Sequence, residues 1–125
     1  MSENESMDML REIFKMQKAL NDDIAAGRDL HFTPEEWIQK NILATISELS
    51  EVMDEVNFKW WKNHKPIDHA ALLEELTDVL HFYVSMCLHA GVSADELFAA
   101  YCDKNAENYR RQRGLTDKEG YKPEK

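Results

Sequence analysis

The sequence contains few of the residues that interrupt regular secondary structure. Its 125 residues include only four glycines and three prolines, and so few breakers predict long, uninterrupted elements. The content of Glu, Lys, Leu and Ala indicates that these elements are helices. No stretch of alternating polar and apolar residues is long enough to predict a sheet. We therefore predict an all-α fold.

Cysteines and membrane-length apolar stretches are also scarce. The only two cysteines, Cys87 and Cys102, lie in apolar helical patterns, which is typical of reduced core thiols and not of a disulfide framework. The longest uncharged stretch, residues 79–94, is too short to span a bilayer. Residues 1–6 are polar and acidic, unlike a signal peptide. We expect a soluble, cytoplasmic protein.

Basic residues are outnumbered, which gives a net charge of −9. This charge argues against a nucleic-acid partner, because neutralising backbone phosphates requires clustered Lys and Arg. It does not exclude a small phosphorylated substrate, since bound divalent cations can invert the local field. The length fits one domain. We predict a single catalytic domain over residues 1–114 and a polar tail over 115–125.

Four helical segments can be placed between the breakers. Capping signals mark three of the helix starts, and glycines follow three of the ends. The segments are about 6–26, ended by Gly27; one that opens with Thr33-Pro34-Glu35-Glu36; one capped by Asp68 and running to Ala90, before Gly91; and one that opens with Ser93-Ala94-Asp95-Glu96 and runs to about Arg113, before Gly114. Short loops between them indicate a four-helix domain.

Two of these helices carry carboxylates in regular spacing. On the second helix an acidic row lies on one face, away from an apolar stripe, and taken alone it fits a solvated surface. The third helix is apolar on almost every side, so it should be buried and its Glu75 and Asp78 should point inward. Buried ionised carboxylates require compensating cations or protons. The acidic row is Glu48, Glu51 and Glu55, and the stripe is Ile38, Ile42, Ile46, Leu49, Met53 and Val56.

A metal ion would compensate these charges. ExxE on one helix and ExxD on another supply only hard oxygen ligands, which favour Mg²⁺ or Mn²⁺. A di-iron bundle would need a Glu-x-x-His motif on each of two helices, whereas only Asp78-x-x-His81 is present. No Cys/His cluster suits zinc, and no Walker loop is found. The residues alone predict a Mg²⁺ site and hydrolysis of a phosphate ester or anhydride.

The paired ExxE and ExxD motifs resemble those of the all-α nucleoside triphosphate pyrophosphohydrolases, which include MazG-like enzymes and dimeric dUTPases. Further segments are similar to the dimeric dUTPase branch, in the same order, from about Gln17 to Lys122. The chain is shorter than many members, and the part after Gln112 aligns poorly. The segments are Gln17-Lys18-Ala19-Leu20-Asn21, Phe58-Lys59-Trp60-Trp61-Lys62, Asp78-x-x-His81-Phe82 and Lys104-Asn105-x-x-Asn108-x-x-Arg111-Gln112.

The resemblance implies Mg²⁺-dependent hydrolysis of dUTP to dUMP and pyrophosphate. Two or more Mg²⁺ ions would be held by the four carboxylates, and Glu48 would also activate the attacking water. The implied metal ligands are Glu48, Glu51, Glu75 and Asp78. The implied substrate-binding residues are Gln17 and Asn21 with an aromatic such as Phe58 for the base, Lys59, Lys62, Lys104 and Arg111 for the polyphosphate, and Trp61, His81, Asn105 and Asn108.

Several alternatives stay open at this stage. The chain could be a broader MazG-like enzyme acting on dCTP or modified nucleotides, or a catalytically silent helical interaction module. Gln17 and Asn21 could merely tie the first helix to its neighbours, and His81 could be a satisfied core histidine. The basic residues near Arg111 could simply favour a helix C-terminus.

One copy of the chain is too small to bury all its apolar surface. The aromatic run around Trp60 and the third helix both require cover, and the aromatics themselves could be core or interface anchors. We therefore expect a homodimer or a dimer of dimers, which the resemblance also implies.

Overall fold

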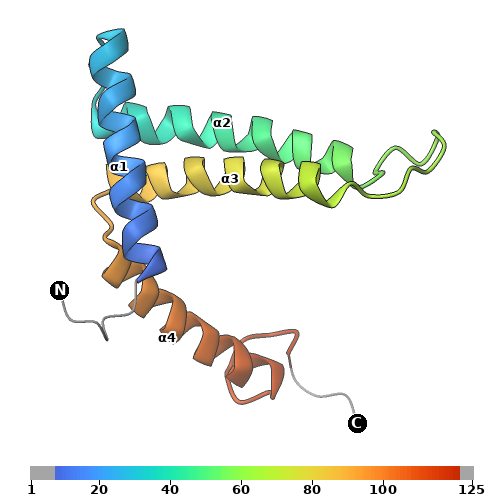
Figure 1. Cartoon of the computed structure of the whole chain (residues 1–125). Coiled ribbons are helices and arrows are strands. Elements are labelled where there is room, and N and C mark those ends of the chain that lie inside the picture. The colour runs from blue at the N-terminus through green and yellow to red at the C-terminus, as the bar shows by residue number, and fades with distance from the viewer. Residues whose placement is uncertain (1–7, 122–125) are drawn as a thin grey trace, which may run out of the picture. The chain divides into compact units, whose positions relative to one another are not determined.

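The computed structural model describes residues 8–121 and contains four helices (Figure 1). They are α1 (Met9–Arg28), α2 (Pro34–Glu55), α3 (His69–His89) and α4 (Ala94–Gln112). Within residues 8–121 there is no strand, so the predicted all-α fold with four helices is confirmed. The start expected near residue 6 lies outside the described residues. No helix in this part of the chain is long and apolar enough to cross a membrane.

The chain forms two compact units. The first contains α1, α2 and α3 and ends at Val92, and the second begins at Ser93 and contains α4. Each unit is described below by itself. The expected division into a catalytic domain over 1–114 and a tail over 115–125 stays a prediction.

Each helix begins at a residue whose side chain accepts a hydrogen bond from the backbone N–H three positions on. These capping residues are Asp8, Thr33, Asp68 and Ser93. At α2 the capping box is complete: Thr33 Oγ1 accepts from the Glu36 N–H, and Glu36 Oε1 accepts from the Thr33 N–H, both at 3.2 Å. Each such cap stabilises a helix by about 1 kcal/mol. The predicted starts at Thr33, Asp68 and Ser93 are confirmed.

The predicted end of the first helix is wrong. α1 continues through Gly27 to Arg28, and Asp29 forms the C-cap with a left-handed φ of 54°. The N–H of Leu30 then donates to the carbonyl of Ala25 at 2.9 Å and closes the helix end. Asp tolerates this conformation because its short polar side chain relieves part of the steric cost, so glycine was not needed here. α3 ends as predicted, with Gly91 at a φ of 75° directly after its cap.

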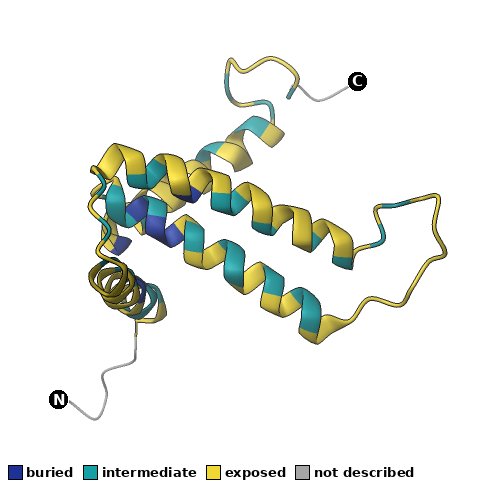
Figure 2. Ribbon diagram, turned by 90° about the horizontal axis from the view of Figure 1, so that it is seen from above, coloured by how far each residue is buried: buried dark blue, intermediate teal, exposed yellow. Residues whose placement is uncertain are grey.

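In the first unit, α2 and α3 lie side by side along their lengths, and α1 crosses α3 (Figures 1 and 2). Residues 56–68 connect α2 to α3 at the end away from α1. Hydrogen bonds join α1 to the second half of α3, from Gln17 to His81 and from Asn21 to Ser85. The unit is therefore a long helical hairpin that a third helix covers at one end.

The prediction that α3 is buried on all sides is wrong for the single chain. Its buried residues are Val84, Ser85 and Cys87, which lie in the half near α1. Four large apolar side chains on α3 are 40–57% exposed, because α2 covers only one side of the helix. These exposed residues are Leu73, Leu76, Leu80 and Tyr83. Both cysteines were expected to be core thiols. Cys87 is buried, as expected, but Cys102 is exposed.

α2 presents its polar face to α3 and its apolar stripe to the surface. Glu48 is half-buried on the α3 side, while the stripe residues after Ile38 are 42–59% exposed. They are Ile42, Ile46, Leu49, Met53 and Val56. The amphipathic pattern identified both faces, but it could not tell which of them meets α3. A contiguous exposed apolar surface is typical of an association interface.

Candidate active site

Three carboxylates from two helices meet between α2 and α3. Glu48 and Glu51 lie one turn apart on α2, and Glu75 on α3 stands opposite them. One carboxylate oxygen from each residue lies within 4.8 Å of the other two. Residues three apart on a helix share a face, so the ExxE spacing is what aims both α2 side chains at α3.

Two of these carboxylates each have one oxygen without a hydrogen-bond partner. The Oε2 atoms of Glu48 and Glu75 are buried and accept no hydrogen bond from residues 8–121. The pKa of Glu75 is raised from 4.5 to about 7, first by its hydrogen bond to Glu51, then by desolvation and by the charges of Glu51, Asp78 and Glu48. The pKa of Glu48 is also raised, chiefly by desolvation and then by Glu51 and Asp78. Asp78 is thus close enough for its charge to act on the cluster.

This donor set fits a hard divalent cation. The three clustered carboxylates provide only oxygen ligands, which Mg²⁺ and Mn²⁺ prefer. Asp78, the fourth predicted ligand, is not among the residues whose carboxylate oxygens meet in this group. Two of the oxygens are buried without partners, and a cation between them would remove both the desolvation cost and the mutual repulsion. Glu55, the third member of the acidic row, is half-buried but does not belong to this group.

A second polar cluster joins α1 to α3 through a chain of hydrogen bonds. The side chains of His81 and Gln17 are bonded through Nδ1 and Oε1. Gln17 Nε2 donates to Asn21 Oδ1 at 2.9 Å, and Asn21 Nδ2 donates to Ser85 Oγ at 3.1 Å. Ser85 Oγ in turn donates to the backbone carbonyl of His81 at 2.7 Å. We call these four residues the amide chain.

The amide chain favours the structural alternative for Gln17 and Asn21. Gln17 and Ser85 are only 6% and 3% exposed, and each amide already has both a donor and an acceptor partner inside the protein. Base reading by Gln17 and Asn21 stays a prediction. The core-histidine alternative required His81 to be both hydrogen-bonded and buried. His81 is hydrogen-bonded to Gln17, but it is exposed.

The loop between α2 and α3 carries exposed aromatic side chains. The Trp60 and Trp61 rings are perpendicular with centroids 4.7 Å apart, and Phe58 meets the edge of Trp61 at 6.4 Å. Phe58, Trp60 and Trp61 are 38%, 86% and 59% exposed. They are therefore not core residues of the single chain. Such exposure suits the interface alternative or contact with a ligand.

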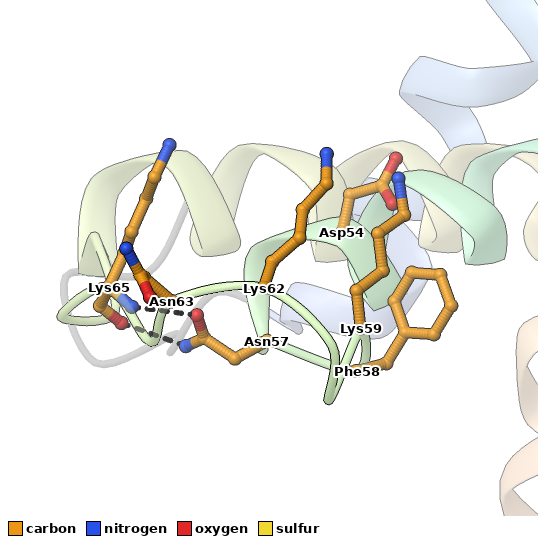
Figure 3. Close-up of a pocket in the computed structure, with 7 residues that line it drawn as sticks. All are labelled: Asp54, Asn57, Phe58, Lys59, Lys62, Asn63 and Lys65. Carbon is orange, nitrogen blue, oxygen red and sulfur yellow. Dashed lines mark hydrogen bonds between the residues drawn. The ribbon is translucent and has the colours of Figure 1, made fainter.

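Beside these aromatics lies a basic cavity of about 180 Å³. Figure 3 shows the side chains of Lys59, Lys62 and Lys65 projecting on the same side of the loop. Three ammonium groups at one opening attract anions such as phosphate. The sequence pointed to Lys59 and Lys62 but missed Lys65. The cavity is lined by Asp54, Asn57, Phe58, Lys59, Lys62, Asn63 and Lys65.

Asn57 brings Lys65 to this cavity. It follows α2 with a left-handed φ of 57°, a conformation that Asn tolerates better than most residues. Its Nδ2 donates to the carbonyl of Lys65 at 2.8 Å, and its Oδ1 accepts from the Lys65 N–H at 2.9 Å (Figure 3). One side chain thereby fixes the return of the loop. An Asn just past a helix end was the available sequence signal.

The remaining predicted substrate residues lie on α4, in the second unit. Lys104, Asn105 and Asn108 are exposed. Arg111 is half-buried and donates to Glu107 at 2.8 Å, and its buried Nε has no hydrogen-bond partner within residues 8–121. Because the two units are described separately, the roles of these four residues at the active site stay predictions.

Comparison with known proteins places this geometry in a family. The model of a family described as dUTPase matches residues 9–96, a segment that holds all four carboxylates and the lysine loop but ends before Lys104. Among curated proteins, the dCTP pyrophosphatase of Enterobacteria phage T4 is 29% identical over 58% of this chain and 51% of its own length. The dCTP pyrophosphatase of Enterobacteria phage LZ5 is 38% identical over 46% of this chain and 34% of its own length.

The chain thus spans about half of the length of the first of these curated relatives and about a third of the second. No solved structure matches it. The family match covers more than half of the chain, and the four-helix architecture agrees with it. The chain belongs to the all-α dUTPase family.

Proposed function

We propose that this protein hydrolyses a pyrimidine deoxynucleoside triphosphate to the monophosphate and pyrophosphate, with Mg²⁺. The observation that carries the proposal is the carboxylate cluster, in which buried oxygens of Glu48 and Glu75 have no hydrogen-bond partner among the residues that the structure describes. A folded protein does not retain such a cluster without a compensating ligand unless the carboxyls take up protons. Family membership supports the same chemistry.

The roles of the carboxylates follow from their positions. Glu48, Glu51, Glu75 and Asp78 would hold Mg²⁺, which when bound neutralises phosphate charge and polarises the phosphorus under attack. As the motif resemblance implies, Glu48 acts as the general base that takes the proton of the attacking water. The water oxygen bonds to phosphorus as the bridging P–O bond breaks, and pyrophosphate leaves.

The basic cavity supplies the counter-charge. Lys59, Lys62 and Lys65 surround it, and preorganised cations at a polyphosphate stabilise the charge that develops on the leaving group. Asn57 acts here as a positioning residue, because its two hydrogen bonds to the Lys65 backbone hold the loop in place.

Two substrates have specific support. The motif resemblance and the family description favour dUTP. The curated relatives are named dCTP pyrophosphatases, which favours dCTP as the second candidate. We retain dUTP as the first candidate, because the motif match extends over the carboxylates, the lysine loop and the first helix.

A pyrophosphate-release assay over the four deoxynucleoside triphosphates, with and without Mg²⁺, tests the proposal. We expect turnover that requires the metal and is fastest with dUTP or dCTP. Absence of metal-dependent turnover on all four would refute the enzyme and leave the silent interaction module. A ratio of kcat/KM between dUTP and dCTP decides which candidate is correct.

We further propose that the protein works as a homodimer or a dimer of dimers. The exposed stripe of α2 and the exposed apolar residues of α3 form a surface that a second copy would cover. Light scattering at micromolar concentration should give at least twice the mass of the chain. Ile46→Glu, in the stripe, should yield a monomer, and Gln39→Glu, an exposed residue off the stripe, should not. A stable, active wild-type monomer would remove this proposal.

A further inference from the structure

The loop between α2 and α3 differs in charge from the rest of the chain. Residues 56–67, which we call the tip loop, contain three lysines and no aspartate or glutamate, in a chain whose net charge is −9. The tip loop lies at the end of the α2–α3 hairpin away from α1 (Figure 1). Asp54, which borders it, shares a cavity with all three lysines. A local positive charge therefore stands at one end of the first unit.

The tip loop also exposes apolar side chains. Every residue from Trp60 to Ile67 is exposed, and Trp60 and Ile67 are 86% and 54% exposed. Trp61, Phe58 and Val56 add three further exposed apolar side chains. Apolar groups that gather on a surface beside charged ones are typical of an interaction site. The tip loop thus combines two features that a binding partner would have to match.

Trp60 has no part in the proposed hydrolysis. Its ring meets the Trp61 ring edge-on, with centroids 4.7 Å apart, and this contact leaves most of the indole open to water. An indole gains free energy when its apolar body is removed from water while its N–H stays near polar groups. An exposed tryptophan among lysines therefore indicates a partner that has both an apolar part and an anionic part.

Single-stranded nucleic acid has both parts but fits the geometry poorly. Proteins that bind it stack successive bases on aromatic rings. The Trp60 and Trp61 planes are 88° apart, so the two rings cannot both stack on neighbouring, parallel bases. The aliphatic side chains of Val56 and Ile67 would also find no counterpart along a polar sugar–phosphate backbone.

An anionic membrane surface fits better. Tryptophan rings settle at the headgroup level of a bilayer, anionic lipids attract lysines, and aliphatic side chains reach the acyl boundary. None of these contacts requires the two rings to be parallel. The 22 residues of α2 extend over about 33 Å, whereas charges more than about 8 Å apart are largely screened at physiological ionic strength. The acidic residues at the far end of the hairpin therefore repel the membrane only weakly.

We propose that the tip loop binds the surface of an anionic membrane, with Trp60 at the level of the headgroups and the lysines facing lipid phosphates. Such peripheral binding requires no membrane-spanning helix. Phosphate is also the group that the proposed function assigns to Lys59, Lys62 and Lys65, so the same cations suit both ligands. Trp60 serves the membrane alone.

Flotation of the full chain with lipid vesicles tests the proposal. We expect wild type to bind vesicles of equal parts phosphatidylcholine and phosphatidylserine more strongly than vesicles of phosphatidylcholine alone. Trp60→Ser should lower the partition onto the mixed vesicles by about tenfold. Leu43→Ser, which removes a 68% exposed apolar side chain from α2, is the control and should bind as wild type does. Lys62→Gln should lower binding to the mixed vesicles by about fivefold and leave binding to phosphatidylcholine unchanged.

A second variant guards against a failure to fold. Trp60→Ser should melt at the wild-type temperature, because the side chain that it removes is exposed. If it does not, Ile67→Ser removes another exposed apolar side chain of the tip loop and should also weaken vesicle binding. Absence of binding to the mixed vesicles would overturn the proposal. So would binding that the folded tip-loop variant leaves unchanged.

Two further measurements distinguish other occupants of the tip loop. In light scattering, Trp60→Ser should keep the wild-type mass; a lower mass would mean that a second copy covers the loop, and the proposal would be wrong. Fluorescence anisotropy with labelled oligothymidylate should show no binding. Binding that Trp60→Ser abolishes would assign the loop to single-stranded nucleic acid instead of a membrane. None of these measurements requires nucleotide hydrolysis, so their outcome does not depend on the proposed function.

Discussion

Two polar clusters lie between helices in the first unit, and they differ in how their hydrogen bonds are satisfied. In the amide chain, Gln17, Asn21, Ser85 and His81 pair donors with acceptors. In the carboxylate cluster, one oxygen each of Glu48 and Glu75 has no hydrogen-bond partner in the described part of the chain. Buried polar groups in folded proteins are almost always paired. The difference therefore separates a site that holds the fold together from one that is built for a ligand.

The physical reason is the kind of group in each cluster. Amides and hydroxyls both donate and accept, so a few of them can satisfy one another. Ionised carboxylates only accept, and four of them repel each other in a partly desolvated place. Either protons or a cation must relieve that repulsion. In the absence of metal, protonation relieves the repulsion, and the raised pKa of Glu75, about 7, reflects this. Bound Mg²⁺ would relieve the same repulsion.

The largest effect should come from removing one carboxylate of the cluster. Glu75→Gln should reduce Mg²⁺-dependent turnover by about 100-fold or more, since loss even of a group that supports a metal ligand costs 10–100-fold. Thermal stability without metal should stay the same or rise, because one of the repelling charges is gone. Glu74→Gln, the exposed neighbour on α3, is the control and should retain activity. An unfolded Glu75→Gln protein with normal activity per folded molecule would make Glu75 structural.

The amide chain should respond in the opposite way. Asn21→Ala leaves Gln17 Nε2 without its acceptor and removes the donor to Ser85 Oγ, so the free energy of unfolding should fall by about 1–3 kcal/mol. Turnover of dUTP and dCTP should slow together, with their ratio unchanged. Chemical denaturation and kinetics with both substrates measure this, with the exposed Asp23→Ala as control. A changed dUTP/dCTP ratio would instead restore Asn21 as a base reader.

A smaller effect concerns pH in the absence of metal. The folded-state pKa of Glu75 lies at about 7, above its ordinary 4.5, so between these values the folded state binds more protons than the unfolded state. Its contribution to stability is complete below 4.5 and is lost as the pH rises through 7. In chelator, the melting temperature should therefore fall from pH 5 to pH 8 more steeply in wild type than in Glu75→Gln.

Adding Mg²⁺ extends the same measurement of melting temperature. At pH 8 added Mg²⁺ should raise the wild-type melting temperature, since a ligand that binds the folded state stabilises it. Asn21→Ala should respond to pH and Mg²⁺ as wild type does, because its cluster carries no carboxylate. If Mg²⁺ leaves the wild-type melting temperature at pH 8 unchanged, the metal assignment is contradicted.

The amino-acid sequence was sufficient for the local features. The starts of α2, α3 and α4 at Thr33, Asp68 and Ser93 follow from hydrogen bonds that span three residues. The pairing of Glu48 and Glu51 on one face of α2 follows from helical periodicity alone. The end of α1 was misjudged because Asp29 could take the left-handed position that the glycine pattern suggested for Gly27.

Only the tertiary structure decided the relations between residues that are distant in the sequence. Which face of α2 meets α3, the joining of Asn21 to Ser85 and the return of Lys65 to Asn57 all depend on how the segments pack. A helical pattern defines faces but not their neighbours, because the energy of burying a face depends on what covers it. Local hydrogen bonds thus fixed the helices of this protein, and long-range packing fixed which of its polar groups were left free to bind.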